Sequence, residues 1–197
     1  MEKEQVRKTI QQEIEKHAVK GKEYLKRQLE KFQLIFNSPI INPWKLVTFL
    51  EIKLYKADLS KYKVRGFFKI DENNIPLICY HQSLSNPELR FTIMHEIAHK
   101  LLLDYVRGLY LGEDMEDNIG NAVYDLVDDE HQFLSNQDQV EQICDEFAIE
   151  ALMPETVLNQ FENRYGNKDI GAISDYFGLE PGLVSAAIRF RSRGGKN

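Results

Sequence analysis

The sequence predicts an α+β protein with one core, in which a small antiparallel sheet packs on a buried central helix. Three observations support this fold class. Strand-like segments are confined to residues 52–80, helical periodicity dominates the remainder, and the most apolar helical segment directly follows the strands. The chain has 197 residues, 43% of them hydrophobic, which is enough for one domain with an additional helical segment.

Residues 3–36 have the pattern of a charged amphipathic helix. Its apolar side chains recur near helical spacing: Val6, Ile10, Ile14, Ala18, Leu25, Leu29, Phe32 and Phe36. Such a face indicates burial but not the surface against which it is buried, so two interpretations are equally open. The segment is either a partner-binding or oligomerising arm, or a helix packed on the rest of the protein. We assign residues 1–38 to this arm, which ends at the hinge-like Ser38-Pro39 pair, and residues 39–197 to the main domain.

A short helix and three strands are predicted after the arm. The helix is expected around residues 44–50, and the strands around residues 52–55, 64–70 and 75–80. The turn-prone segment Asp71-Glu72-Asn73-Asn74 separates the last two strands. This succession predicts a small antiparallel sheet, without indicating which strand lies at its edge.

A long apolar helix is predicted directly after the strands. Asn86 is a suitable N-cap, Pro87 suits the first helical position, and Glu88 favours the positive end of the helix dipole. Apolar residues then form a wide helical face: Leu89, Phe91, Ile93, Met94, Ile97, Ala98, Leu101, Leu102 and Leu103. A helix this apolar is expected at the centre of the protein.

This helix contains the HExxH sequence His95-Glu96-Ile97-Ala98-His99, which is typical of zinc peptidase helices. Residues four apart lie on the same helix face, so both imidazoles can reach one metal ion. Glu96 lies one step round the helix, where its carboxylate can take a proton from a zinc-bound water. Either histidine alone would more often be a core residue, but the pair with Glu96 between them favours a zinc site.

A catalytic zinc site needs one more protein ligand besides water. The best candidate is Glu141, in a second predicted helix that begins near Ser135 and Asp138 and ends at Pro154. Asp145 lies one turn after Glu141, and this spacing suits a ligand followed by a carboxylate that hydrogen-bonds a ligand imidazole. The alternative is that both residues are solvated charges on a helix face.

The two motifs together resemble the ImmA/IrrE family of bacterial zinc metallo-endopeptidases, which are gluzincin-like. Residues 90–99 resemble the family's RFTxAHExxH helix, and residues 141–154 resemble its E-x-x-A-N-x-F-A-x-x-L-L-M-P segment. The resemblance covers about residues 39–190. It departs from the family pattern at Cys144 and Asp145, which stand where Ala and Asn are usual.

The resemblance implies a zincin-like fold and a zinc-dependent endopeptidase. Zinc bound by His95, His99 and Glu141 would polarise the scissile carbonyl. Glu96 would activate the water and later protonate the leaving amine, with Asp145 supporting a ligand imidazole. The implied substrate is a helix-turn-helix transcriptional repressor, often encoded beside the enzyme on mobile elements or in stress-response loci.

A non-catalytic, zinc-containing regulator that binds a repressor or antitoxin-like partner is the alternative function. The presence of Glu96 argues against this alternative, because a structural zinc ion needs no general base.

Residues 104–139 form an acidic segment between the two motif helices, and the long step between the motifs suggests an insertion. The segment is either a lid that repels acidic substrates or recruits a basic partner, or a solvated insertion without a specific role. Four residues in it are candidates for polarising the scissile carbonyl, and the sequence selects none of them: Tyr105, Tyr110, Tyr124 and His131.

Residues 169–191 predict a helix, a glycine turn and a second helix, and this pair resembles a helix-turn-helix with a basic end. In the ImmA/IrrE family a similar pair packs on the peptidase core. A short basic tail on a chain of net charge −6 is a weak electrostatic footprint, so direct nucleic-acid binding is not expected.

Cys79 and Cys144 are too few for a disulfide framework, so we expect both to be free and buried, with Cys144 serving in packing. The sequence shows no signal segment and no run of membrane-spanning length, so we expect a cytoplasmic protein without membrane contact. Its oligomeric state is left open.

Overall fold

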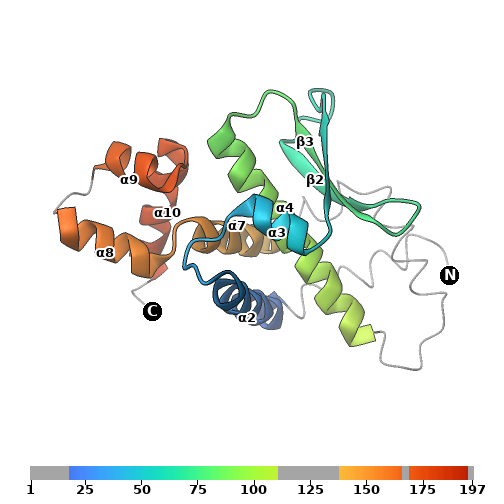
Figure 1. Ribbon diagram of the computed structural model, residues 1–197, viewed down its shortest axis with the longest axis horizontal. Helices are drawn as coiled ribbons and strands as arrows, with labels where there is room; N and C mark the ends of the chain where they lie inside the picture. Colours follow the sequence, from blue (N-terminus) through green and yellow to red (C-terminus); the bar gives the residue numbers. More distant parts are fainter. Residues whose placement is uncertain (1–17, 111–137, 166–168, 195–197) are drawn as a thin grey trace.

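The computed structural model describes residues 18–110, 138–165 and 169–194, and its helices and strands confirm the predicted α+β fold class (Figure 1). The elements follow in chain order: α2 (Ala18–Phe36), α3 (Pro43–Phe49), β1 (Lys53–Ala57), β2 (Gly66–Ile70), β3 (Pro76–His81), α4 (Asn86–Tyr110), α7 (Asp138–Leu152), α8 (Glu155–Tyr165), α9 (Ile170–Phe177) and α10 (Pro181–Gly194).

The sheet is mixed, so the prediction of a wholly antiparallel sheet is wrong for one of its two strand pairs. The strand order is β1-β3-β2; β2 pairs antiparallel with β3, whereas β1 pairs parallel with β3. The tight turn at Asp71, whose carboxylate accepts the N–H groups of Asn73 and Ile75, joins β2 to β3 as a hairpin. The connection from β1 to β2 instead carries the chain across the position of β3. Strand propensity reports that each strand exists, but it does not specify this crossing.

α4 is the central helix and packs against the sheet, α2, α3 and α7. Ile93, Met94, Ile97 and Ala98 are completely buried in the one hydrophobic core cluster of the described residues. Its apolar stripe therefore places the helix as expected from the sequence.

The N-cap of α4 is Ser85, and the expectation that Asn86 caps the helix is wrong. Ser85 and Glu88 form a reciprocal capping box: Ser85 Oγ accepts the N–H of Glu88 at 3.3 Å, and the N–H of Ser85 donates to Glu88 Oε2 at 3.0 Å. A pair that satisfies two backbone donors outcompetes a single Asn side chain one residue later.

α2, the described part of the predicted N-terminal arm, packs against α4 and α7. Leu25, Leu29 and Phe32 are buried in the common core, and an added Cβ on Gly21 would lie 3.0 Å from Leu102 Cδ2 of α4. These contacts favour the interpretation in which this segment is part of the folded body. Residues 1–17 lie outside the described part of the chain.

The C-terminal helices form a group beside α7, and the predicted helix–glycine–helix pair corresponds to α9 and α10 (Figure 1). Gly178 ends α9 in the left-handed conformation with φ of 63°. Arg90 of α4 donates to the carbonyls of Phe177 at 2.7 Å and Gly178 at 2.8 Å, so the pair is fastened to the central helix. Helix α8 was not among the predicted elements, although its buried Val157, Leu158 and Phe161 have helical spacing.

Cys79 and Cys144 are free and buried, which confirms that expectation. None of the described helices combines the length and apolar character that a membrane-crossing segment requires.

Candidate metal centre

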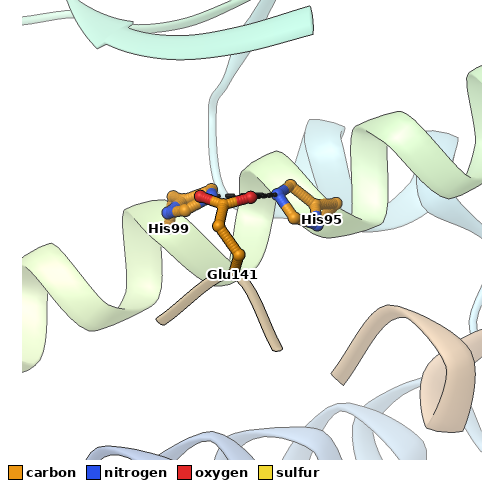
Figure 2. Close-up of side chains that lie close together, drawn as sticks. All are labelled: His95, His99 and Glu141. Carbon is orange, nitrogen blue, oxygen red and sulfur yellow. Dashed lines mark hydrogen bonds and ion pairs between the residues drawn. The ribbon is translucent and has the colours of Figure 1, made fainter. Parts of the chain in front are cut away.

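Two helices that are distant in sequence bring the predicted site residues together. α4 supplies His95, Glu96 and His99 from its middle, and α7 supplies Glu141 and Asp145 from its first two turns. α4 and α7 pack closely, and Figure 2 shows Glu141 reaching from α7 towards the two imidazoles on α4.

The nitrogen and oxygen atoms that face one another fit a single metal ion. His95 Nε2 lies 2.9 Å from His99 Nε2 and 3.1 Å from Glu141 Oε2, and His99 Nε2 lies 3.3 Å from Glu141 Oε1. In a tetrahedral zinc site with bonds of about 2.0–2.1 Å, ligand atoms lie about 3.3 Å apart. The three donors therefore already have nearly the separations that one tetrahedral ion requires.

Asp145 fixes the orientation of His95. Its Oδ1 lies 2.8 Å from His95 Nδ1, which turns Nε2 of the same ring towards His99 and Glu141. This carboxylate–imidazole contact is the usual support for a metal-binding histidine, because it sets the tautomer and increases the basicity of the free nitrogen.

The protein atoms alone strongly shift the pKa values of His95 and Glu141. Burial lowers the pKa of His95, but hydrogen bonds with Asp145 and Glu141 and the charges of Glu96 and Glu141 outweigh it and raise this pKa to about 10. Burial raises the pKa of Glu141, whereas the hydrogen bonds and charges of His95 and His99 lower it to about 2. Both shifts describe a protonated His95 paired with an ionised Glu141. A metal cation could take the place of the proton on His95.

Glu96 is buried, with 7% of its surface exposed, between α4 and the sheet. Burial raises the pKa of its carboxyl, while the charges of His99 and His95 and a backbone hydrogen bond from Phe68 act in the opposite direction. A carboxyl with a raised pKa beside a possible metal site accepts a proton more readily than an ordinary glutamate, which suits a general base.

Comparison with known proteins identifies the family. Residues 49–189 match the model of the IrrE N-terminal-like domain, peptidase family M78. The chain belongs to this family. It is also 25% identical over 122 residues to "Uncharacterized immunity region protein 2" of Bacillus phage phi105, an alignment that covers 62% of this chain and 65% of that protein.

Membership of peptidase family M78 places the chain in a metallopeptidase-type family. The sequence resemblance to the ImmA/IrrE family is thereby confirmed. The cluster of His95, His99 and Glu141 is compatible with a metal ion in this peptidase fold.

Cys144 lies one turn after Glu141 but is completely buried. Burial, with smaller effects from the carboxylates of Glu141, Glu96 and Asp145, raises the pKa of its thiol well above the usual value. Its complete burial in the hydrophobic core is consistent with its predicted role in packing.

Two residues of β2 that the sequence did not indicate lie beside Glu96 at the candidate metal centre. An added Cβ on Gly66 would lie 2.5 Å from Thr92 Cγ2 and 3.7 Å from Glu96 Oε1, so only glycine allows β2 to approach α4 this closely. Phe68 supplies the backbone hydrogen bond to Glu96. A glycine at the start of an apolar strand was the available signal for this close approach.

The four candidates for polarising a carbonyl are not brought together in the described residues. Tyr105 packs its ring on Tyr24 with centroids 4.9 Å apart. The side chain of Tyr110, and residues Tyr124 and His131, lie outside the described part of the protein, as does most of the predicted acidic insertion.

Proposed function

We propose that this protein is a zinc-dependent endopeptidase whose zinc is bound by His95, His99 and Glu141. The observation that supports this most strongly is the placement of three donor atoms from α4 and α7 at separations of 2.9–3.3 Å, with Asp145 hydrogen-bonded to the outer nitrogen of His95. Two imidazoles and one carboxylate form a known catalytic zinc set that leaves a position open.

Zinc held by His95, His99 and Glu141 would supply Lewis acidity, which favours attack of water on the scissile carbonyl. Glu96 then takes a proton from the attacking water and delivers it to the leaving amine. Its burial and raised pKa favour both steps, because a buried carboxyl gains and loses a proton nearer neutral pH. Asp145 keeps His95 in its ligating orientation throughout.

The substrate chain is proposed to lie along the outer edge of β2. The N–H of His81 donates to the carbonyl of Arg65, and the N–H of Asp71 donates to the carbonyl of Ile75, at the two ends of the β2–β3 pairing. In an antiparallel pair these two hydrogen bonds determine which residues of β2 direct their backbone groups towards β3. The backbone groups of Gly66, Phe68 and Ile70 consequently point away from β3. The N–H of Phe68 donates to Glu96, so the substrate would bond to the other backbone groups of these residues. Main-chain hydrogen bonds to an extended peptide there would grip substrates of varied sequence.

A helix-turn-helix transcriptional repressor is the proposed substrate. Two observations support it: the ImmA/IrrE resemblance of the motifs, and the similarity to a protein of a phage immunity region. We place the reaction in the cytoplasm, where such a repressor binds its operator.

Glu96→Gln tests this proposal, because it keeps the shape of the side chain and the metal donors but removes the base. Purified wild-type protein should contain about one zinc per chain, and His99→Ala should lose most of it. Glu96→Gln should retain zinc while cleavage of the repressor encoded nearest to the gene falls about 10²–10⁴-fold. Glu30→Gln, an exposed change of the same chemistry on α2, serves as the control.

The alternative function, a zinc-containing regulator that acts by binding its repressor, predicts a different result. Glu96→Gln would then relieve repression in cells as fully as the wild-type protein does.

A further inference from the structure

The sheet has one face against α4 and a second, outer face with a distinct composition. The register aligns Leu54, Ile78 and Phe68 across the three strands on the face that packs towards the core. The alternate residues therefore share the outer face in three rows: Lys53–Leu77–Lys69, Tyr55–Cys79–Phe67 and Ala57–His81–Arg65. Figure 1 shows the sheet at one side of the molecule, with α4 passing beneath it.

Positive charge is concentrated in the segment that contains α3, β1, β2 and the loop between the two strands. Residues 43–70 contain seven lysines and arginines and two acidic residues, so this segment has a net charge of +5. The chain as a whole carries −6, and the remainder therefore carries −11. We call the outer-face and loop residues Lys53, Lys61, Lys63, Arg65 and Lys69 the basic face.

The basic face has free charges and exposed aromatic rings among the described residues. Arg65 has a long ion pair of 3.9 Å with Glu88, and within the described ranges the four lysines have no acidic partner at ion-pair distance. Tyr55 and Tyr62 are 60% and 63% exposed. Tyrosine and arginine are enriched at protein-binding surfaces, and the unpaired lysines add a positive potential that is complementary to an acidic partner.

The basic face adjoins the edge proposed to bind substrate. Lys69 lies on β2 and Arg65 immediately precedes it, and both alternate with the residues whose backbone groups point away from β3. In a paired strand, side chains directly opposite each other point to the same face of the sheet. Every second residue of a peptide on β2 would therefore lie on the outer face, beside Arg65 or Lys69.

We propose that the basic face binds an acidic segment of the protein substrate, next to the strand held on β2. This inference rests on the proposed function and names the chemistry of its substrate. A protein segment fits the basic face better than nucleic acid does. A nucleic acid longer than the basic face would extend over the rest of the protein, whose net charge of −11 would repel its phosphates. A short acidic segment of a protein would contact only the basic face and would avoid this repulsion.

The test measures binding of a fluorescent oligoglutamate peptide to the zinc-loaded, full-length Glu96→Gln protein by anisotropy, at low and at physiological salt. K53E/K69E should weaken binding about tenfold or more, and K53Q/K69Q should weaken it less. K26E/R27E, which reverses two exposed charges on α2, should change binding less than about twofold and controls for net charge.

Three results would overturn the proposal: no oligoglutamate binding by the parent protein, unchanged binding in K53E/K69E, or tighter binding of oligothymidylate than of oligoglutamate. Unchanged binding would mean that the lysines only protect a sheet edge from pairing. Because the assay uses a variant without the base, its result does not depend on hydrolysis. Oligoglutamate binding by a protein that proves to have no peptidase activity would refute only the proposed function. Peptidase activity without oligoglutamate binding would refute only the proposed role of the basic face.

Discussion

His95 contacts an acidic side chain through each of its ring nitrogens, Asp145 through Nδ1 and Glu141 through Nε2. The sequence predicted His95 and His99 as neighbours because helix periodicity alone places residues four apart on one face. Glu141 could be selected only through its own helix pattern and the family resemblance. No local rule specifies that α7 lies across α4, since that contact depends on tertiary packing.

Substitutions of Asp145 distinguish a residue that supports a ligand from a surface charge. Its side chain is 51% exposed, yet it holds His95 Nδ1 at 2.8 Å. Asp145→Ala should reduce zinc affinity about 10–100-fold, whereas Asp145→Asn should be milder because its amide oxygen can still accept the hydrogen bond. Competition with a chelator measures both. Equal wild-type affinity in the two variants would show that the contact does not position His95.

The pH dependence of the metal-free protein follows from the His95–Glu141 pair. The pKa of His95 is raised from 6.5 to about 10, so its contribution to stability is complete below pH 6.5 and is lost as the pH rises towards 10. The pKa of Glu141 is lowered from 4.5 to about 2, so its contribution is complete above pH 4.5 and is lost as the pH falls towards 2. After chelation, the melting temperature of wild type minus that of Glu141→Gln should be largest between pH 4.5 and 6.5. A difference independent of pH would contradict the ion pair.

At the scale of elements, patterns fixed within one segment were predicted better than relations between segments. The central helix, the β2–β3 hairpin and the glycine turn at Gly178 all depend on local spacing and turn chemistry. The parallel pairing of β1 depends on a crossing that no strand encodes by itself. The N-cap lies one residue earlier than predicted, because the reciprocal bonds of Ser85 and Glu88 satisfy two backbone donors whereas an Asn86 cap would satisfy one.

Gly66→Ala should separate β2 from α4. The new methyl group would lie 2.5 Å from Thr92 Cγ2 and 3.0 Å from the carbonyl oxygen of Cys79, so the strand must move. We expect a loss of about 1–3 kcal/mol in the free energy of unfolding, measured with urea, and a larger relative loss of cleavage as Phe68 shifts from Glu96. Gly182→Ala is the control, since its added Cβ meets no heavy atom within 4 Å.

Removing the opposing methyl group provides a stricter check of this cause. Thr92→Ser deletes the Cγ2 atom that the new Cβ would contact, so Gly66→Ala with Thr92→Ser should recover part of the lost stability. If Gly66→Ala alone were as stable and active as wild type, the close approach of β2 to α4 would not be needed.

For the whole molecule, the folded body is larger than the family match. That match covers residues 49–189, yet α2 buries Leu25, Leu29 and Phe32 in the same core as the metal-site helices. Ile41 then donates its N–H to the carbonyl of Ala151 at 2.9 Å, which ties the segment after α2 to the end of α7. The sequence could show that residues 3–36 have an apolar stripe, but it could not show what the stripe covers. The structure shows that the apolar stripe of α2 covers a surface formed by the packing of α4 against α7.

Deleting residues 1–37 should therefore damage the metal centre rather than release an independent arm. The deletion exposes the faces of α4 and α7 that α2 covers, and loss of three large buried side chains costs more than a typical domain can tolerate. We expect insoluble protein, or soluble protein with lowered zinc content and melting temperature. Deletion of residues 1–17 alone is the matched control, because it leaves every described contact of α2 in place. Size-exclusion mass and zinc content, measured on both truncations, test this prediction. A monomeric protein that lacks residues 1–37 but retains full zinc would show that the core of α4, α7 and the sheet is complete without α2.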